Sequence, residues 1–521
     1  MRKILLILSG LLLCTFLAPS PAAADEPVDL LRTLYQKRFT LDPSGAPLVL
    51  IGLAQGLDAL EISSPDGVDL LPNGPSGVRI GGPKAVKITR TTGAPGRVQY
   101  HLALEAVGLA DAALIAKTKA RLAPRGVVAK EQGYVISMGP RMLDTRRVLF
   151  SLGPYTAQQA NDQLEKERAA FPHAFVHAEF AALPSGTFVA AAADSSLRVT
   201  QSGAMAFEPT GKAPLAYTLA GKSHRVDGRL IVLFGMDGRL TLVNELSIEK
   251  YLEGILPSEM FPSAPAEALK SQAVAARGQV LAKMGQRHNT DPFHLCSQVH
   301  CQVYDGLEKA DPRTTAAVQQ TAGQVLFDTA GHPADTVYSS SCGGHGEHNE
   351  HVWGGKPNPQ LRGLPDGDMP GKDLARFLGR PSRSFCGKLP GGAAAFRWKI
   401  VKTAAELQKS LAAVGFAGAV TELVPRRRGV SGRILELEVK GGAKPLVLSG
   451  ELVIRRALGG LRSSLFMHKK LKNGAFEFTG AGFGHGVGLC QWGAMGRAQD
   501  GQKAPEILKH YYPGAQLLKL Y

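Results

Sequence analysis

The sequence has few aromatic residues and only one long hydrophobic run. Phe, Trp and Tyr make up 7% of the 521 residues, which is thin for the platforms on which single-stranded nucleic acids stack. Beyond the N-terminal run, no apolar stretch approaches the roughly 20 residues of a membrane-spanning helix. These absences argue against a nucleic-acid partner and against membrane spans in the rest of the chain.

Acidic residues are outnumbered by basic ones. The chain has 44 Asp and Glu against 60 Lys and Arg, a net charge of +16. Such a balance indicates a polyanionic partner, although it also serves solubility. For a secreted chain, a cell-wall polymer that carries carboxylates fits best.

The long apolar run lies at the N-terminus and reads as a secretory signal. Arg2 and Lys3 precede an apolar stretch that ends at Ala18, and small residues at 22–24 supply a cleavage site. This pattern predicts a signal peptide over 1–24, with an uncleaved anchor as the alternative. We therefore expect the protein in the periplasm or in the cell wall and exterior, with no transmembrane segment after cleavage.

Cysteines are scarce, and five of the six lie beyond the signal. They are Cys296, Cys301, Cys342, Cys386 and Cys490. An odd number in an oxidising compartment leaves one thiol unpaired or diverts some thiols to a metal.

Hydrophobic periodicity divides the mature chain into three parts. Residues 25–96 alternate apolar and polar positions and predict a β-rich N-terminal segment. Residues 97–180 predict the order β-α-β-β-α-β, in which two helices cover one face of a small antiparallel sheet. Residues 185–521 mix strands with helices. The fold class expected is α+β.

One acidic residue stands ahead of a predicted helix. In "ILPSEMFPSAPAEALKSQAVAARGQVLAK" (255–283), apolar residues recur at steps of three and four, which predicts a helix with Ser263 as N-cap and Pro265 in its first turn. We expect Glu259 in a turn fenced by Pro257 and Pro262. Its carboxylate is either catalytic or one of the acids that helix starts favour.

Five blocks of sequence, with core motifs at 240–345 and 479–521, resemble the SpoIID/LytB family. They are "LTLVNELSIEKYLEGILPSEMFPSAPAEALKSQAVAARGQVLA", "HCQVYDG", "VYSSSCGGHGE", "GFGHGVGLCQWGAMGRAQDGQ" and "ILKHYYPGAQL", in family order. Gly278 departs from the family pattern, past the motif that holds Glu259. The resemblance implies a lytic transglycosylase that cleaves peptidoglycan glycan strands, as SpoIID does on strands stripped of stem peptides. The alternative it implies is a non-catalytic enhancer of a cell-wall amidase, as for LytB.

The resemblance also assigns site residues. The Glu of its "PSEM" motif maps onto Glu259 as the catalytic acid, and His300 and Tyr338 map near the active site. His485, between Gly484 and Gly486, is placed to contact substrate or to make a buried hydrogen bond; these three are the predicted substrate-binding residues.

The lytic reaction explains why one carboxylate suffices. Ordinary glycosidases use two, but here the muramyl 6-hydroxyl closes on the anomeric carbon and no attacking water is needed. Glu259 would protonate the glycosidic oxygen and then accept the hydroxyl proton, which a raised pKa favours. The family pattern makes the nearby acid, Glu253, a scaffold residue.

A Cys/His cluster in "HNTDPFHLCSQVHCQVYDG" predicts a zinc site. Cys296, Cys301 and His288 supply ligands that suit zinc, and some family members bind zinc through a His and two Cys in this stretch. His294 is an alternative to His288, and a Cys296–Cys301 disulfide is the alternative to the metal. A zinc hydrolase is disfavoured because no H-E-x-x-H pattern is present.

A second resemblance concerns 97–180. The stretch "RRVLFSLGPYTAQQANDQLEK" is similar to the SPOR domain, whose sheet binds glycan strands that lack stem peptides. An ordinary structural insert is the alternative.

Overall fold

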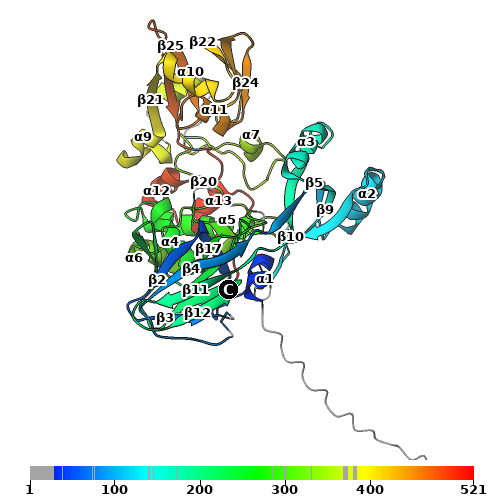
Figure 1. Ribbon diagram of the computed structural model, residues 1–521. Coiled ribbons are helices and arrows are strands. Elements are labelled where there is room, and N and C mark those ends of the chain that lie inside the picture. Colours follow the sequence, from blue (N-terminus) through cyan, green and yellow to red (C-terminus); the bar gives the residue numbers. More distant parts are fainter. Residues whose placement is uncertain are drawn as a thin grey trace, which may run out of the picture.

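The computed structural model has a β-rich body from which two smaller lobes project (Figure 1). It describes residues 29–521 except 38, 73, 76, 139–140, 145, 172, 286, 299–300, 330, 368–372 and 380–383. The predicted signal peptide lies outside the described residues. The fold is mixed and rich in β-structure, as expected.

Two six-stranded sheets form the body. The first has the order β18-β1-β17-β16-β13-β3 and the second β12-β11-β4-β2-β14-β15. The bounds of the first are β1 (Leu48–Leu57), β3 (Val68–Leu71), β13 (Ala204–Pro209), β16 (Arg229–Phe234), β17 (Leu240–Ser247) and β18 (Leu295–Cys296). Those of the second are β2 (Ala59–Ser63), β4 (Ala85–Ala94), β11 (Ser185–Ala192), β12 (Arg198–Ser202), β14 (Leu215–Leu219) and β15 (Lys222–Val226).

Apolar side chains point alternately to the two faces of the first sheet, so a hydrophobic core lies on each face. In β16, Val232 and Phe234 join the main core shared with the second sheet, while Ile231 and Leu233 face the opposite way. Because successive side chains of a strand point to opposite faces, both faces of this sheet need a cover. On the second face the cover includes helix α1 (Leu30–Gln36).

The N-terminal strands pair with strands far along the chain. β1 lies antiparallel to β17, with Leu48 opposite Ser247. The boundary predicted at residue 96 therefore separates strands that share sheets, and 25–96 is not a structural unit by itself. Strand periodicity is local, whereas the choice of partner depends on residues about 190 positions away.

Residues 97–182 form the lobe that carries α2 and α3 (Figure 1). Its elements are β5 (Arg97–Gly108), α2 (Ala112–Leu122), η1 (Ala123–Arg125), β6 (Val128–Gln132), β7 (Val135–Met138), β8 (Arg141–Asp144), β9 (Arg147–Tyr155), α3 (Ala157–Glu167) and β10 (Phe175–Ala182). The sheet order is β10-β5-β9-β6, with every neighbouring pair antiparallel. The predicted order of elements is present, with an additional β7–β8 hairpin. The lobe has its own core, which includes Leu102, Leu104 and Phe150.

A helical layer lies beside the body and holds the predicted long helix. It comprises α4 (Ile248–Glu259), α5 (Ala266–Lys283), α6 (Pro312–Gln320), α12 (Gln491–Gln499) and α13 (Ala504–Tyr511). Two details of the prediction are wrong. Helix α5 begins after Pro265 with no side-chain cap, so Ser263 is not its N-cap. Glu259 is the last residue of α4, because that helix continues for two residues past Pro257.

The remaining elements form short links and the upper lobe. The links are β19 (Gln324–Phe327), β20 (Tyr338–Ser339), α7 (Asn349–Trp353), α8 (Leu374–Gly379), η2 (Phe385–Gly387), η3 (Pro390–Gly392), α9 (Ala393–Phe396), β27 (Leu489–Cys490) and β28 (Gln516–Lys519). The lobe contains β21 (Arg397–Lys402), α10 (Ala404–Ala412), β22 (Gly418–Arg428), β23 (Ile434–Gly442), β24 (Leu446–Ser449), α11 (Glu451–Ala457), β25 (Phe466–Lys470) and β26 (Phe476–Ala481), with a separate core. No helix among the described residues combines the length and apolarity needed to cross a bilayer.

A buried ion pair joins α4 to α5, and we expect its loss to be costly. Arg277 is fully buried, and its Nε and Nη2 donate to the two carboxylate oxygens of Glu249 at 2.8 and 2.6 Å. Glu249→Ala leaves the guanidinium without its counter-charge, so we expect unfolding to become easier by about 3–5 kcal/mol. Chemical denaturation measures this, with Glu422→Ala, from the exposed Lys440 pair, as control at under about 1 kcal/mol. Equal small losses in both variants would contradict the prediction.

Candidate active site

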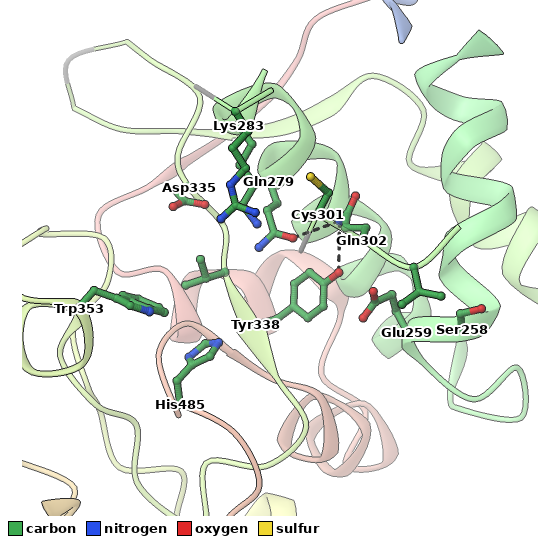
Figure 2. A pocket seen from close by; sticks show the side chains of 13 residues that line it. Ser258, Glu259, Gln279, Lys283, Cys301, Gln302, Asp335, Tyr338, Trp353 and His485 are labelled. Carbon is green, nitrogen blue, oxygen red and sulfur yellow. Dashed lines mark hydrogen bonds between the residues drawn. The ribbon is translucent and has the colours of Figure 1, made fainter. Parts of the chain in front are cut away.

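A cavity of about 690 Å³ opens beside the end of α4 (Figure 2). Its walls come from α4, α5, the segments around 302 and 337, α7 and the glycine-rich stretch near 485. The lining residues are Ser258, Glu259, Gln279, Lys283, Arg287, Cys301, Gln302, Val303, Asp335, Val337, Tyr338, Trp353 and His485. The fold thus brings together Glu259, Tyr338 and His485, which are up to 226 positions apart in the numbering.

The Glu259 carboxyl is half-buried in this cavity. Burial raises the pKa of Glu259, while a hydrogen bond with Tyr338 and the charge of Lys283 partly oppose the rise. Its place at the carboxyl end of α4 acts in the same direction as burial, because the negative end of a helix disfavours an anion. The alternative that Glu259 is one of the acids favoured at helix starts is therefore wrong, because it lies at a helix end that disfavours its charged form.

The glycine-rich segment fixes the backbone of Glu259. Nε2 of Gln491 donates to the carbonyl oxygen of Glu259 at 2.7 Å, and lies 3.4 Å from Oε1 of Gln272. Gln491 begins α12, directly after β27. The stretch "GLCQWG" thus positions the acid through a contact that the sequence did not reveal.

A hydrogen-bond chain orients the tyrosine. Nε2 of Gln302 donates to the Tyr338 hydroxyl at 3.2 Å and to Oε1 of Gln279 at 3.1 Å. With its oxygen accepting from Gln302, the Tyr338 hydroxyl donates toward Glu259, and Figure 2 shows the hydroxyl end of the ring directed toward both residues. The chain fixes the direction of the acid's hydrogen-bond partner.

We expect Tyr338→Phe to weaken any reaction that uses Glu259. It removes a hydrogen bond to a charged group, worth about 1.5–3 kcal/mol, which corresponds to a fall of about 10–100-fold in rate if the bond persists in the transition state. The hydrogen bond lowers the pKa of Glu259, so the variant's rate should also decline at higher pH than the wild type's. A pH profile of glycan cleavage checks this; an unchanged profile would mean that Tyr338 only packs.

His485 is held neutral at the opposite wall. Its Nδ1 accepts from the Val487 amide at 3.0 Å, which leaves the proton on Nε2. Burial lowers the pKa of His485 to about 3. The Trp353 ring lies 4.9 Å away between centroids and is 53% exposed. This wall therefore offers a neutral imidazole and an accessible aromatic face.

The glycines beside His485 face the protein rather than the cavity. Gly484 has φ +101°, and a Cβ there would lie 2.8 Å from that of Ser339. Gly486 has φ +77°, and its Cβ would lie 2.4 Å from the guanidinium carbon of Arg433. Both need glycine for backbone conformation and close approach. Of the three predicted substrate-binding residues, only His485 lines the cavity.

The predicted metal ligands converge next to the cavity. The ligand atoms of His288, Cys296 and Cys301 all lie within 4.8 Å of one another. Nε2 of His288 lies 3.3 Å from the Cys301 sulfur, while Nδ1 bonds Oδ2 of Asp291 at 2.8 Å. A carboxylate behind the imidazole is the usual support for a zinc-binding histidine. Two thiols and this oriented histidine fit zinc.

His294 is not part of this cluster. Its Nδ1 accepts from the Leu50 amide at 3.0 Å, its ring stacks on Phe39, and burial lowers its pKa to about 3. The alternative ligand considered from the sequence is therefore wrong. His300 lies outside the described residues, and its role stays a prediction. Glu253 bonds Lys250 and Gln319, as a scaffold residue would.

Sequence reasoning missed several cavity residues. Gln279 and Lys283 lie four apart on α5 and point into the cavity (Figure 2). Their spacing of four residues places both on one face of α5. Other polar residues of the same helix, such as Lys270 and Gln272, meant that the sequence did not single them out. Burial lowers the pKa of Lys283 to about 8. Trp353 gave no signal, because the sequence around it shows no periodicity.

Comparisons with known proteins match the part of the chain that builds this cavity. The family model described as stage II sporulation protein matches residues 236–327, and a domain of unknown function matches 347–488. An uncharacterised protein of Brachyspira hyodysenteriae is 31% identical over 280 residues, which are 54% of this chain and 68% of that protein. The amidase enhancer of Bacillus subtilis is 30% identical over 296 residues, 51% of this chain and 40% of that protein. Stage II sporulation protein D of Bacillus amyloliquefaciens is 26% identical over 289 residues, 53% of this chain and 75% of that protein.

Proposed function

This chain belongs to the SpoIID/LytB family, and we propose that it is a lytic transglycosylase acting on peptidoglycan glycan strands. The observation that carries the proposal is the half-buried Glu259 carboxyl, whose pKa is raised, at the wall of the cavity. A carboxyl that holds its proton nearer neutral pH suits a general acid. The names of the relatives support a function related to the cell wall.

Four of the cavity residues take a definite part. Glu259 protonates the glycosidic oxygen as the bond to the anomeric carbon breaks. The resulting carboxylate, held by the Tyr338 hydroxyl, then accepts the proton of the muramyl 6-hydroxyl as that oxygen attacks the same carbon. Proton and bonds balance within the sugar, and the product is a 1,6-anhydromuramyl end. The Trp353 face and the neutral His485 ring are placed to pack against a sugar ring.

The charge of the cavity favours glycans without stem peptides. Lys283 and Arg287 both line it. When the stem peptide is removed, the lactyl group of muramic acid carries a free carboxylate, whereas in intact peptidoglycan the same group is a neutral amide. Cations near the sugar therefore select the stripped strand, in agreement with the net charge of +16.

Mass spectrometry of digested wall material tests the proposal. We expect the purified protein to release fragments with 1,6-anhydromuramyl ends, lighter by one water than hydrolytic products, and faster from amidase-treated sacculi than from intact ones. Asp335 is a second carboxylate at the cavity wall, and reducing ends instead of anhydro ends would indicate a two-carboxylate hydrolase. Either that result or no cleavage would overturn the proposal.

The second candidate is a non-catalytic enhancer of a cell-wall amidase. The named amidase enhancer among the relatives favours it. On this alternative the protein cleaves neither kind of sacculus but accelerates a purified wall amidase, and Glu259→Gln accelerates it equally. Loss of acceleration without Glu259 would exclude a purely binding role.

We also propose that His288, Cys296 and Cys301 hold one structural zinc ion. The donor set fits: two thiolates and a histidine that is oriented by Asp291. The ion would tie the segment that carries Cys301 and Gln302 to the rest of the cavity wall. Bound there, it would supply a rigid cross-link rather than bond cleavage.

The lobe over 97–182 is proposed to bind denuded glycan strands. It is inserted at the tip of a hairpin, because β4 and β11 pair antiparallel with Ala94 opposite Ser185. Replacing 96–183 by a short turn therefore leaves that hairpin closed. We expect this variant to keep cleavage but lose preferential binding to amidase-treated sacculi, measured by pull-down. Unchanged preference would make the lobe a structural insert.

The proposed site of action is outside the cytoplasm, in the periplasm or at the cell wall. Peptidoglycan is found there, and the predicted signal sequence agrees with that location. No role for nucleic acid is proposed.

A further inference from the structure

Three cysteines left without a role gather around one carboxylate. Cys342, Asp366, Cys386 and Cys490 are all buried, and one ligand atom from each lies within 4.8 Å of the others. Cys490 ends β27, which pairs with β20, and Cys342 follows β20 by three residues. Asp366 and Cys386 come from the excursion between α7 and α9. Three distant segments thus meet in one polar cluster inside the fold.

The distances within the cluster match four ligands around one ion. The sulfurs of Cys342 and Cys386 are 3.7 Å apart, and Oδ2 of Asp366 is 3.6 Å from the Cys342 sulfur. In a tetrahedral zinc site with Zn–S of about 2.3 Å and Zn–O of about 2.1 Å, two sulfurs lie about 3.8 Å apart and a sulfur and an oxygen about 3.6 Å apart. The side chains already stand at the spacing that zinc imposes.

Outer hydrogen bonds leave one oxygen of Asp366 for a metal. Oδ1 accepts from Nε and Nη2 of Arg497, each at 3.1 Å, and from the Tyr511 hydroxyl at 2.8 Å. Oδ2 faces the thiols. The Cys490 sulfur accepts from two backbone amides, those of Cys342 at 3.1 Å and Gly493 at 3.3 Å. Such support orients ligands and stabilises a thiolate.

The rest of α12 is fitted to this cluster. A Cβ at Gly493 would lie 2.5 Å from Oδ2 of Asp366 and 2.0 Å from the Tyr511 hydroxyl. A Cβ at Gly496 would lie 2.2 Å from the carbonyl oxygen of Phe385. The two glycines let the helix approach the excursion closely enough for Cys490 and Cys386 to meet.

We propose that Cys342, Asp366, Cys386 and Cys490 form a second, structural zinc site, separate from that of His288, Cys296 and Cys301. A disulfide is the competing account, but it uses only two of the three thiols. It gives no part to the third thiol or to Oδ2 of Asp366, while Oδ1 bonds Arg497 and Tyr511 in either account. A four-ligand site uses all of them. In this site zinc offsets two of the four anionic charges and Arg497 a third.

The ion would anchor both segments that carry the active-site side chains, β20 and the stretch that leads into β27. Tyr338 begins β20, four residues before Cys342, and His485 lies five residues before Cys490. Gln491, which bonds the Glu259 carbonyl, directly follows Cys490. The site therefore acts by position. It contacts no substrate, and this inference does not depend on the reaction proposed above.

Elemental analysis of the full mature chain, purified without chelator, tests the site. We expect two zinc ions in the wild type, one in Cys301→Ser and one in Cys386→Ser. If Cys386→Ser does not fold, Cys301→Ser decides by itself: one retained zinc supports the proposal, and a folded zinc-free protein overturns it. A disulfide between any two of Cys342, Cys386 and Cys490 in a non-reduced digest also overturns it. If the wild type holds one zinc ion and Cys301→Ser keeps it, the result contradicts only the site of His288, Cys296 and Cys301.

Two neighbouring tyrosines provide a test variant and a matched control for measuring zinc affinity at the second site. Tyr511 donates to Asp366, whereas Tyr512 donates to the carbonyl oxygen of Val337 at 2.9 Å. In the Cys301→Ser background, Tyr511→Phe should lower zinc affinity by about 10–100-fold, and Tyr512→Phe should not. Competition with a chromogenic chelator measures the difference. Equal affinities in the two variants would show that Asp366 is not a ligand.

Discussion

Glu259→Gln should abolish glycan cleavage and leave the fold and the binding of sacculi intact. The amide keeps the shape of the side chain but supplies no proton to the glycosidic oxygen. General acid catalysis contributes about 10²–10⁴-fold, and because the same residue also serves as base, we expect a loss at or beyond the upper end. Release of anhydromuramyl fragments over time measures the rate, and circular dichroism checks the fold.

The matched control is Glu253→Gln, the same chemical change on the same helix. Glu253 is buried, and its carboxylate accepts from Lys250 and Gln319 rather than facing the cavity. The two donors use different carboxylate oxygens, so the amide keeps one of the two bonds. The change costs stability, but Glu253 does not line the cavity, so we expect cleavage by the folded fraction to stay near the wild-type rate. Cleavage by Glu259→Gln at the wild-type rate, or equal losses in both variants, would remove Glu259 from the role of acid.

Glu259→Gln should also change the stability of the protein, in a direction that follows from the raised pKa of Glu259. The pKa of the Glu259 carboxyl is higher in the folded state than its usual 4.5. The folded protein therefore becomes less stable relative to the unfolded chain as pH rises from the unfolded-state pKa through the folded-state pKa and the carboxyl ionises. Glu259→Gln does not ionise. We therefore expect the variant to match the wild type in acid and to exceed it in stability at neutral pH, as measured by denaturant unfolding.

Cys301→Ser should remove one zinc ion and reduce cleavage even though the metal breaks no bond. Structural zinc sites contribute about 10–16 kcal/mol of apparent binding free energy in small peptides, so we expect its loss to loosen the segment from His288 to Gln302. Gln302 directs the Tyr338 hydroxyl, and its displacement carries the effect to Glu259. Thermal unfolding, zinc content and cleavage rate should fall together.

A nearby serine distinguishes ligand loss from disturbance of the loop. Ser297 lies between the two cysteines in sequence but is not among the three converging residues, so Ser297→Ala should retain zinc and activity. A Cys296–Cys301 disulfide in the wild-type protein, with no zinc at this site, would overturn the proposed zinc site of His288, Cys296 and Cys301. Cys301→Ser with full zinc content would do the same.

Structural features that depend on neighbouring residues could be predicted from the sequence alone. The spacing of Leu269, Ala273 and Ala276 predicted α5, because helical periodicity depends on neighbours within a few turns. The order of strands and helices over 97–180 followed from the same kind of signal. Motif resemblance identified the family. It also singled out Glu259 and the His288 cluster, whose donor types indicate their chemistry.

Tertiary structure decided what depends on distant partners. No sequence pattern indicated that β1 would pair with β17, that Glu259 would be the last residue of a helix, or that Trp353 would face His485. Cys342, Cys386 and Cys490 looked like leftover thiols because their spacing of 44 and 104 residues matches no metal-binding motif. Only when β20 pairs with β27 and the excursion folds back do they meet Asp366. The sequence identifies which side chains can act as acids, bases or metal ligands. Which remote segments lie close together depends on strand pairing and core packing, and no local pattern predicts these.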